Sequence, residues 1–310
     1  MGMLVNGKWV KGPIVSSDKQ GAYDRQPRTF LDFISKDHPV FKPESNRYHL
    51  YVSYACPWAT RVLIYRNLKG LAPHISVSVV HPDMLEEGWV FDGYFDGATE
   101  DHLFGFRYLS EVYKKADPNI TTSVTVPVLW DKKTNTIVNN ESADIIRMFD
   151  TSFNDLTGNT TDYYPPDKRA EIDLLNDTIY HTVNNGVYKA GFAKTQEAYD
   201  TAVKLLFQTL DELDEILATK KYLTGDEVTE ADLRLIPTLL RFDLVYVTHF
   251  KCNVKQIKEY KNLSRYTKDL YDLSAIKETT NFDHIKRHYY FSHATINPYR
   301  IIPQGPDTLF

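Results

Sequence analysis

The pattern of apolar and polar positions changes character twice along the chain. Residues 1–47 are polar, rich in turn-forming residues and interrupted by prolines, so we expect an extended arm with little regular structure. Residues 48–54, Tyr-His-Leu-Tyr-Val-Ser-Tyr, are aromatic and β-branched enough to predict a strand. From about residue 166 apolar residues recur at three- and four-residue steps, which predicts packed helices.

Further elements follow the first predicted strand. Pro57 and Gly70 frame a helix, because proline favours the first helical position and glycine the position just past the end. The alternating segment 75–80 predicts a second strand, which completes a βαβ unit. Segments 124–130 and 136–138 flank a turn and predict a β-hairpin, and a helix is expected to open at 140–142.

The second half contains two long apolar stripes at helical spacing. The stripes consist of Ile172, Leu175, Ile179 and Val183, and of Tyr199, Val203, Leu206, Leu210, Leu213 and Leu217. We expect these stripes to form the core of a helical domain and not a cofactor site. In the same half, Thr229 and Asp232 have the spacing of a capping box, with Asp in place of Glu.

These patterns predict an α/β domain followed by an all-α domain. The expected division is an arm at 1–47, an α/β domain at 48–155 with an insertion at about 82–120, and an α-helical domain with a C-terminal tail at 166–310. Asn, Thr, Gly and Pro cluster in the linker between the two domains.

Composition narrows the class of protein. The chain has 310 residues and a net charge of −5, which excludes a strongly basic protein, and we expect no nucleic-acid partner. No apolar run reaches the roughly 18 residues of a membrane span, and the first residues turn polar before an export signal could form. We therefore expect no membrane association and a cytoplasmic location.

The only cysteines, Cys56 and Cys252, predict neither a disulfide framework nor a thiolate zinc site. His284 and His288 are four residues apart, which is compatible with a metal site. No third ligand is evident, however, and the neighbouring Lys286 and Arg287 would repel a cation, so we expect a solvated helix face there and no metal.

Cys56 is the residue most suited to chemistry. It precedes Pro57 where a strand passes into a helix, so it should be the N-cap, where the helix dipole favours a thiolate. A buried structural cysteine is the alternative, since free cysteines are often buried. The position three residues on is Ala59, so anything bonded to the Cys56 sulfur must be released by an external thiol.

Two other segments suit a peptide ligand. Val126 precedes Pro127 at the start of a hairpin strand, where a cis bond would present the Val126 backbone to an extended peptide. Glu141 and Ser142 open the next helix, where amides and a hydroxyl could bind an amino acid's carboxylate and Glu141 its ammonium group. Simple helix capping remains the alternative for Glu141 and Ser142.

Together these features resemble the glutathione transferase superfamily over about residues 48–300. That resemblance implies a thioredoxin-like N-terminal domain and an α-helical C-terminal domain. Four longer segments are similar to the glutathionyl-hydroquinone reductases, the Xi class, as are the arm and the insertion. These segments are 53–59 (Ser-Tyr-Ala-Cys-Pro-Trp-Ala), 124–131 (Val-Thr-Val-Pro-Val-Leu-Trp-Asp), 139–149, which begins Asn-Asn-Glu-Ser-Ala-Asp, and 186–193 (Gly-Val-Tyr-Lys-Ala-Gly-Phe-Ala).

The resemblance implies roles for particular residues. Cys56 would be the nucleophile and Tyr188 the proton donor or acceptor near the quinol, while Tyr246 and Tyr289 match tyrosines that would favour the thiolate. The residues implied in glutathione binding are Trp89, Ser123, Val124, Thr125, Val126, Glu141 and Ser142. The family commonly has Arg where this chain has Ser123, so the resemblance implies that a charged contact to glutathione would be missing.

The predicted activity is glutathione-dependent reduction of glutathionyl-hydroquinones through a mixed disulfide of Cys56 with glutathione. Glutathione is a consumed co-substrate, and ping-pong kinetics should follow because no second thiol is at hand. Two alternatives stay open: a broader cysteine-type glutathione transferase that reduces dehydroascorbate or mixed disulfides, and a non-catalytic interaction module of the same fold. The family analogy favours a homodimer.

Overall fold

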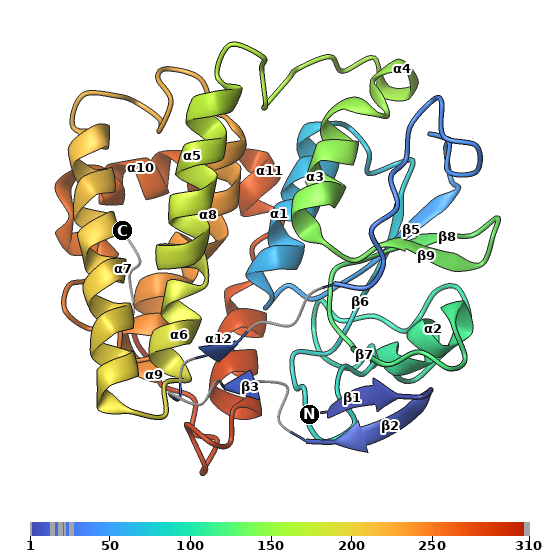
Figure 1. Cartoon of the computed structure of the whole chain (residues 1–310), viewed down its shortest axis with the longest axis horizontal. Helices are drawn as coiled ribbons and strands as arrows, with labels where there is room; N and C mark the ends of the chain where they lie inside the picture. Colours follow the sequence, from blue (N-terminus) through green and yellow to red (C-terminus); the bar gives the residue numbers. More distant parts are fainter. Residues whose placement is uncertain (1, 13–15, 18–20, 22, 25–27, 307–310) are drawn as a thin grey trace. The chain divides into compact units, whose positions relative to one another are not determined.

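A computed structural model describes residues 2–12, 16–17, 21, 23–24 and 28–306 (Figure 1). The chain forms two compact units. The first holds the described residues of Met1–Ile14, Gln26–Asp162 and Thr279–His288. The second holds those of Val15–Arg25, Tyr163–Glu278 and Tyr289–Phe310.

A four-stranded mixed sheet forms the centre of the first unit, in the order β6-β5-β8-β9. The strands are β5 (Tyr48–Val52), β6 (Ser76–Val79), β8 (Val128–Asp131) and β9 (Thr136–Asn139). β5 is parallel to β6 and antiparallel to β8, and β8 is antiparallel to β9. The predicted βαβ unit and hairpin are confirmed. Every residue of β5 is buried, as expected of a central strand.

Three helices accompany this sheet. α1 (Pro57–Leu68) packs against α3 (Ser142–Thr151), and α2 (Leu109–Ala116) contacts β9. In Figure 1 α1 and α3 lie side by side, with α2 on the other side of the strands. Pro57 is at N1 as predicted, and Gly70 takes the left-handed φ of +68° that a helix C-terminus favours. The short helix α4 (Asn154–Thr157) follows α3.

The arm contains more regular structure than its polar pattern predicts. β1 (Gly2–Val5) and β2 (Lys8–Lys11) form a hairpin, and β1 also pairs with β7 (Thr122–Ser123). The expectation of little regular structure is wrong here, because Asn6 and Gly7, at φ 48° and 72°, form the two-residue turn that most strongly favours a hairpin.

A later part of the arm covers the exposed edge of the sheet. The Asp32 amide donates to the Val138 carbonyl at 3.0 Å, and the Asn140 amide donates to the Phe30 carbonyl at 3.1 Å. These bonds extend the ladder beyond β9. They satisfy backbone groups that an edge strand would otherwise expose.

The second unit is mainly helical. Its elements are β3 (Ser16–Ser17), β4 (Tyr23–Asp24), α5 (Arg169–Ile179), the π-helical turn η1 (Tyr180–Asn184), α6 (Gly186–Gly191), α7 (Gln196–Leu217), α8 (Glu230–Arg241), the π-helical turn η2 (Phe242–Tyr246), α9 (Val247–His249), the 3₁₀ turn η3 (Ile257–Glu259), α10 (Lys261–Tyr271) and α11 (Ser274–Lys277). α6 packs along α7, α5 contacts α8, and α10 contacts α7 and α8 (Figure 1). The last helix, α12 (Phe282–Ser292), divides between the units after His288.

The predicted apolar stripes form the core of this second unit. Ile172, Ile179, Leu206 and Leu210 are fully or almost fully buried. Thr229 and Asp232 form the predicted capping box, in which the Thr229 amide donates to Asp232 Oδ2 at 2.8 Å. Among the described residues, no helix combines the length and apolar character that crossing a bilayer requires.

Candidate active site

Cys56 is the N-cap of α1, as its sequence context predicts. Its φ and ψ of −80° and 118° are extended, and its carbonyl accepts the Thr60 amide at 3.0 Å, the first helical hydrogen bond. The residue is partly exposed and its thiol is free. Its Sγ lies 3.7 Å from the carbonyl oxygen of Val126. The helix start thus presents a sulfur atom beside an extended backbone segment.

Cys252 differs in its surroundings. It is fully buried, and burial raises the pKa of its thiol well above the ordinary range. It is therefore held as the neutral thiol, which is a poor nucleophile. Of the two cysteines, only Cys56 combines exposure with a helix N-terminus.

Residues 123–126 form the backbone segment beside Cys56. Ser123 pairs with Met3 in the sheet formed by β2, β1 and β7. The side chains of Val124 and Val126 are buried, and the Val126–Pro127 peptide bond is cis. The segment therefore turns its apolar side chains inward while the Val126 carbonyl lies next to the Cys56 thiol.

Glu141 and Ser142 open helix α3, as predicted. Glu141 is the N-cap, and its Oε1 accepts the Ala143 amide at 3.0 Å and the Ser142 hydroxyl at 3.3 Å. The capping role is therefore real. A carboxylate has about four acceptor positions, so capping leaves Glu141 able to bind a ligand's ammonium group as well.

Tyr113 connects these two segments and was missed by the sequence analysis. Its hydroxyl donates to the Thr125 carbonyl at 2.8 Å and accepts the amide of the same residue at 3.3 Å. It also accepts the side-chain amide of Asn140 at 3.2 Å. The only signal in the sequence is a tyrosine within the insertion, which does not reveal a partner 27 residues away.

Trp89 lies in the insertion and is held by the part of α12 that belongs to the first unit. Its ring stacks on the imidazole of His288 with centroids 4.9 Å apart and an interplanar angle of 20°. His288 Nδ1 donates to the Pro82 carbonyl at 2.8 Å. The guanidinium of Arg287 binds both carboxylate oxygens of Asp83, at 2.7 and 2.8 Å.

The expectation of a solvated helix face at His284 and His288 is wrong. His284 is fully buried and donates from Nε2 to the Asp96 carbonyl at 2.7 Å, and His288 is also buried. Both imidazoles donate hydrogen bonds to backbone carbonyls of the insertion. The spacing of two histidines in one sequence cannot reveal such contacts. Within the described part of the chain, no group of three or more His, Cys, Asp or Glu side chains is placed to hold a metal ion.

The three predicted tyrosines come together in the second unit. The hydroxyl oxygens of Tyr188 and Tyr289 are 2.6 Å apart, and those of Tyr246 and Tyr289 are 3.0 Å apart. Burial raises the pKa of Tyr246 and of Tyr289 well above the usual range for a phenol, so both stay neutral donors. The hydroxyls form a chain that ends at Tyr188, which is only partly buried.

A π-helical turn accompanies two of these tyrosines. η1 ends four residues before Tyr188, and η2 ends at Tyr246. Such turns insert a residue into a helix and are frequent at functional sites. They change which side chains share a helix face, so the 3.6-residue periodicity of the sequence does not predict this cluster.

The predicted residues divide between the two units. Cys56, the 123–126 segment, Glu141 and Ser142 belong to the first unit, together with Trp89. Tyr188, Tyr246 and Tyr289 belong to the second.

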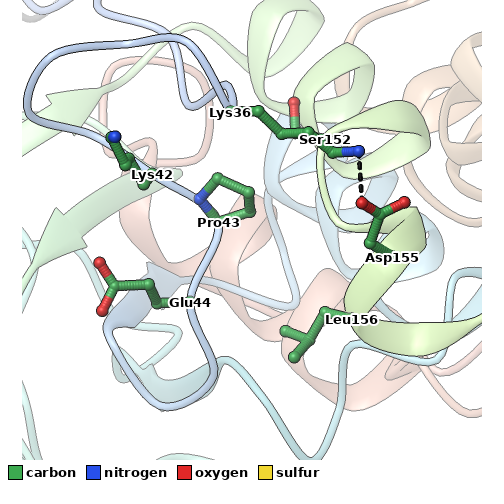
Figure 2. A pocket seen from close by; sticks show the side chains of 7 residues that line it. All are labelled: Lys36, Lys42, Pro43, Glu44, Ser152, Asp155 and Leu156. Atoms are coloured by element: carbon green, nitrogen blue, oxygen red, sulfur yellow. Dashed lines mark ion pairs between the residues drawn. The ribbon is translucent and has the colours of Figure 1, made fainter.

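A hollow of about 330 Å³ in the first unit lies apart from these residues (Figure 2). Lys36 pairs there with Asp155, and Glu44 pairs with Arg47 and Lys133. The residues that line it are Lys36, Lys42, Pro43, Glu44, Ser152, Asp155 and Leu156. None of them is a predicted site residue, and internal ion pairs already occupy three of its four charged groups.

Comparisons with known proteins identify the family of the chain. The glutathione S-transferase N-terminal domain model matches residues 55–152, and the C-terminal domain model matches residues 196–269. The glutathionyl-hydroquinone reductase YqjG of Escherichia coli (strain K12) is 53% identical, with 99% of this chain and 95% of the relative covered.

Two solved structures are similar over most of the chain. The glutathione-S-transferase Xi from Phanerochaete chrysosporium has a TM-score of 0.92 and 50% identity, with 95% of this chain and 96% of the other covered. The glutathione-bound structure of YqjG from Escherichia coli K-12 has a TM-score of 0.91 and 52% identity, with 99% and 97% covered. The fold is therefore a thioredoxin-like domain followed by an α-helical glutathione transferase domain, and the chain belongs to the Xi-class glutathionyl-hydroquinone reductases of the glutathione transferase superfamily.

Proposed function

We propose that this protein reduces glutathionyl-hydroquinones to hydroquinones, with glutathione as the co-substrate. The observation that carries the proposal is the Cys56 thiol at the start of α1, partly exposed and 3.7 Å from the Val126 carbonyl. The Escherichia coli relative named glutathionyl-hydroquinone reductase, and its structure with glutathione bound, support the same activity.

Glutathione is an extended tripeptide with a zwitterionic amino-acid end, and the first unit offers groups that suit both features. The backbone of Val126 would bind the peptide part beside Cys56. The amides at the start of α3 and the Ser142 hydroxyl would bind a carboxylate, and Glu141 would bind the ammonium group. The further contacts in this proposal are Trp89, Ser123, Val124 and Thr125.

The reaction proceeds in three steps in this proposal. Tyr188 protonates the ring carbon that bears sulfur, and the quinol hydroxyl then returns its proton to the Tyr188 oxygen, which gives a keto tautomer. The Cys56 thiolate then attacks the glutathione sulfur, the carbon–sulfur bond breaks, and its electron pair returns to the ring as the hydroquinone leaves. The thiolate of a second glutathione attacks the mixed disulfide, so that oxidised glutathione leaves and the Cys56 thiolate is regenerated. Cys56 supplies the two electrons that reduce the substrate when the mixed disulfide forms. The second glutathione restores them when it reduces that disulfide.

Tyr246 and Tyr289 act through Tyr188 in this proposal. A neutral phenol is a good donor to developing negative charge. The hydroxyl of Tyr289 lies within hydrogen-bond distance of the other two hydroxyls, so it can stabilise a Tyr188 oxygen that has lost its proton. Direct support of the Cys56 thiolate by the hydroxyls of these two tyrosines, which the family resemblance implies, stays part of the proposal.

Assembly and location complete the proposal. We infer a homodimer in the cytoplasm, with residues 48–155 as the glutathione-binding domain and 166–310 as the helical domain that supplies the tyrosines. The support is the family analogy and the presence of only two cysteines, which suits a reducing compartment. Light scattering on the purified protein tests the dimer, and a monomer across micromolar concentrations would contradict it.

The test compares the wild type with Cys56→Ser and with the matched control Cys252→Ser. Turnover of glutathionyl-menadiol with glutathione should vanish in Cys56→Ser and persist in Cys252→Ser. Unchanged turnover in Cys56→Ser would refute the scheme. Faster turnover of dehydroascorbate than of glutathionyl-menadiol would favour the broader transferase, and glutathione binding without cysteine-dependent turnover would favour the non-catalytic module.

A further inference from the structure

The hydroxyl group of Tyr113 uses all of its hydrogen-bonding capacity between two stretches of backbone. A phenol has one donor hydrogen and two acceptor positions. Here the hydrogen goes to the Thr125 carbonyl, while the Thr125 amide and the Asn140 side-chain amide occupy the acceptor positions. Tyr113 is fully buried and Asn140 almost so, which strengthens these bonds.

Asn140 is itself held by the arm. Its backbone amide donates to the Phe30 carbonyl at 3.1 Å, and its side-chain Oδ1 accepts the Phe30 amide at 3.2 Å. The Phe30 ring meets the Tyr113 ring edge to face, with centroids 6.1 Å apart. Thr29 reaches the other segment, because its hydroxyl lies 2.7 Å from the Thr122 hydroxyl. The arm and Tyr113 thus contact both stretches.

These two stretches are the ones assigned to glutathione. Thr125 directly precedes Val126, whose carbonyl is beside the Cys56 thiol, and Asn140 directly precedes Glu141, the N-cap of α3. A ligand that binds at both places needs them at a fixed separation, because a tripeptide cannot follow large changes in spacing without losing contacts at one end.

We propose that Tyr113 is a positioning residue for glutathione: its hydroxyl fixes the separation between the Val126 backbone and the Glu141–Ser142 helix start. This inference rests on the proposed function. Tyr113 does not touch the reacting sulfur, so removing its hydroxyl should weaken glutathione binding and leave the intrinsic reactivity of Cys56 intact.

The test is Tyr113→Phe, with Tyr48→Phe as the matched control. Tyr48 is also fully buried in the first unit, and its hydroxyl donates to the Lys42 carbonyl at 2.7 Å, outside the segments assigned to glutathione. Both variants lose one buried hydroxyl, and Tyr113→Phe should lose more thermal stability because its hydroxyl makes three hydrogen bonds and that of Tyr48 makes one. Only Tyr113→Phe should raise the KM for glutathione, by roughly tenfold, with kcat within about twofold of the wild type.

Alkylation of Cys56 by iodoacetamide without glutathione supplies the second readout, and its rate should be unchanged in Tyr113→Phe. If that variant does not fold, Asn140→Ala removes the side-chain donor to Tyr113, together with the Oδ1 acceptor of the Phe30 amide, and keeps the bond from the Asn140 backbone amide to the Phe30 carbonyl. It should raise the same KM severalfold.

Two outcomes overturn the inference while the wild type remains active: an unchanged KM for glutathione in the variants, or an equal rise in Tyr48→Phe. A wild type without glutathione-dependent turnover would instead refute the proposed function. The two failures are thereby distinguished.

Discussion

The hydroxyl oxygens of Tyr188 and Tyr289 lie 2.6 Å apart, although 101 positions separate the two residues in the sequence. Tyr246 extends the contact, 3.0 Å from Tyr289. Burial keeps the two deeper phenols neutral. A chain of neutral hydroxyls can give up one proton at its exposed end while the remaining hydroxyls stabilise the charge left behind.

This row of three tyrosine hydroxyls predicts losses of turnover that differ in size from one tyrosine to the next. We expect Tyr188→Phe to lower kcat for glutathionyl-menadiol about 100-fold, as loss of a general acid does. Tyr289→Phe should lower it roughly tenfold because it breaks the chain in the middle, and Tyr246→Phe should have a smaller effect. Steady-state kinetics at saturating glutathione measures all three.

Tyr266→Phe is the control for these variants. Its hydroxyl donates to Asp232 Oδ1 at 2.8 Å in the same unit, in a fully buried position that the proposed reaction does not use. It should lower the melting temperature without lowering kcat. A Tyr289→Phe variant whose kinetics match those of Tyr266→Phe would show that the hydroxyl chain is only structural.

The two cysteines should differ strongly in reactivity. Cys56 is partly exposed, whereas burial raises the pKa of the Cys252 thiol far above neutral pH. Titration of the native protein with a disulfide reagent should therefore show one fast thiol, which Cys56→Ser abolishes and Cys252→Ser retains. Two fast thiols in the native state would contradict the assignment.

His288 should affect glutathione binding through Trp89. We expect His288→Ala to raise the KM for glutathione severalfold, because it removes both the ring stack and the bond to Pro82. His288→Phe keeps a stacking ring and should have a smaller effect.

His284→Ala is the control for His288→Ala. His284 lies on the same helix as His288, but its imidazole binds the Asp96 carbonyl of the insertion. In a Trp89→Ala background, His288→Ala should add nothing further to the KM. An additive effect in the double variant would mean that His288 acts by another route.

His49 makes stability depend on pH. It is fully buried between Ser76 and Ser78, at 2.7 and 3.0 Å, and burial lowers its pKa to about 3. Between pH 6.5 and pH 3 the unfolded chain therefore binds the extra proton, so this contribution to stability is complete above pH 6.5 and is lost as the pH falls toward 3.

Replacing His49 should flatten that dependence. We expect the unfolding free energy of the wild type to fall by about 2 to 3 kcal/mol more than that of His49→Gln between pH 7 and pH 4. Urea denaturation at a series of pH values measures the difference. Parallel curves for the two proteins would show that His49 is not the responsible group.

Local patterns predicted the elements that depend on local rules. Pro57 and Gly70 mark the ends of α1, and the apolar stripes at 172–183 and 199–217 lie in the helical core. The arm was predicted less well. Its prolines led to the expectation of little regular structure, although the sequence contains the Asn6–Gly7 pair, a signal for a hairpin turn.

The features that the sequence did not predict depend on contacts between segments that are far apart in the sequence. The spacing of His284 and His288 indicates a polar helix face. In the structure, both imidazoles are buried and contact the insertion. Tyr113 gains its importance from Thr125 and Asn140, neither of which its own neighbourhood in the sequence indicates. Such tertiary pairings leave no periodic trace in a single sequence, and the positions of the tyrosines came from family resemblance alone.

The central claim is that Cys56 takes the glutathionyl group from the hydroquinone. The most direct measurement mixes the enzyme with one equivalent of glutathionyl-menadiol without free glutathione, quenches it, and determines its intact mass and peptide map. We predict one glutathionyl group on Cys56, formed together with one equivalent of menadiol and removed by added glutathione. Menadiol released with no glutathionyl group on Cys56 would contradict the claim.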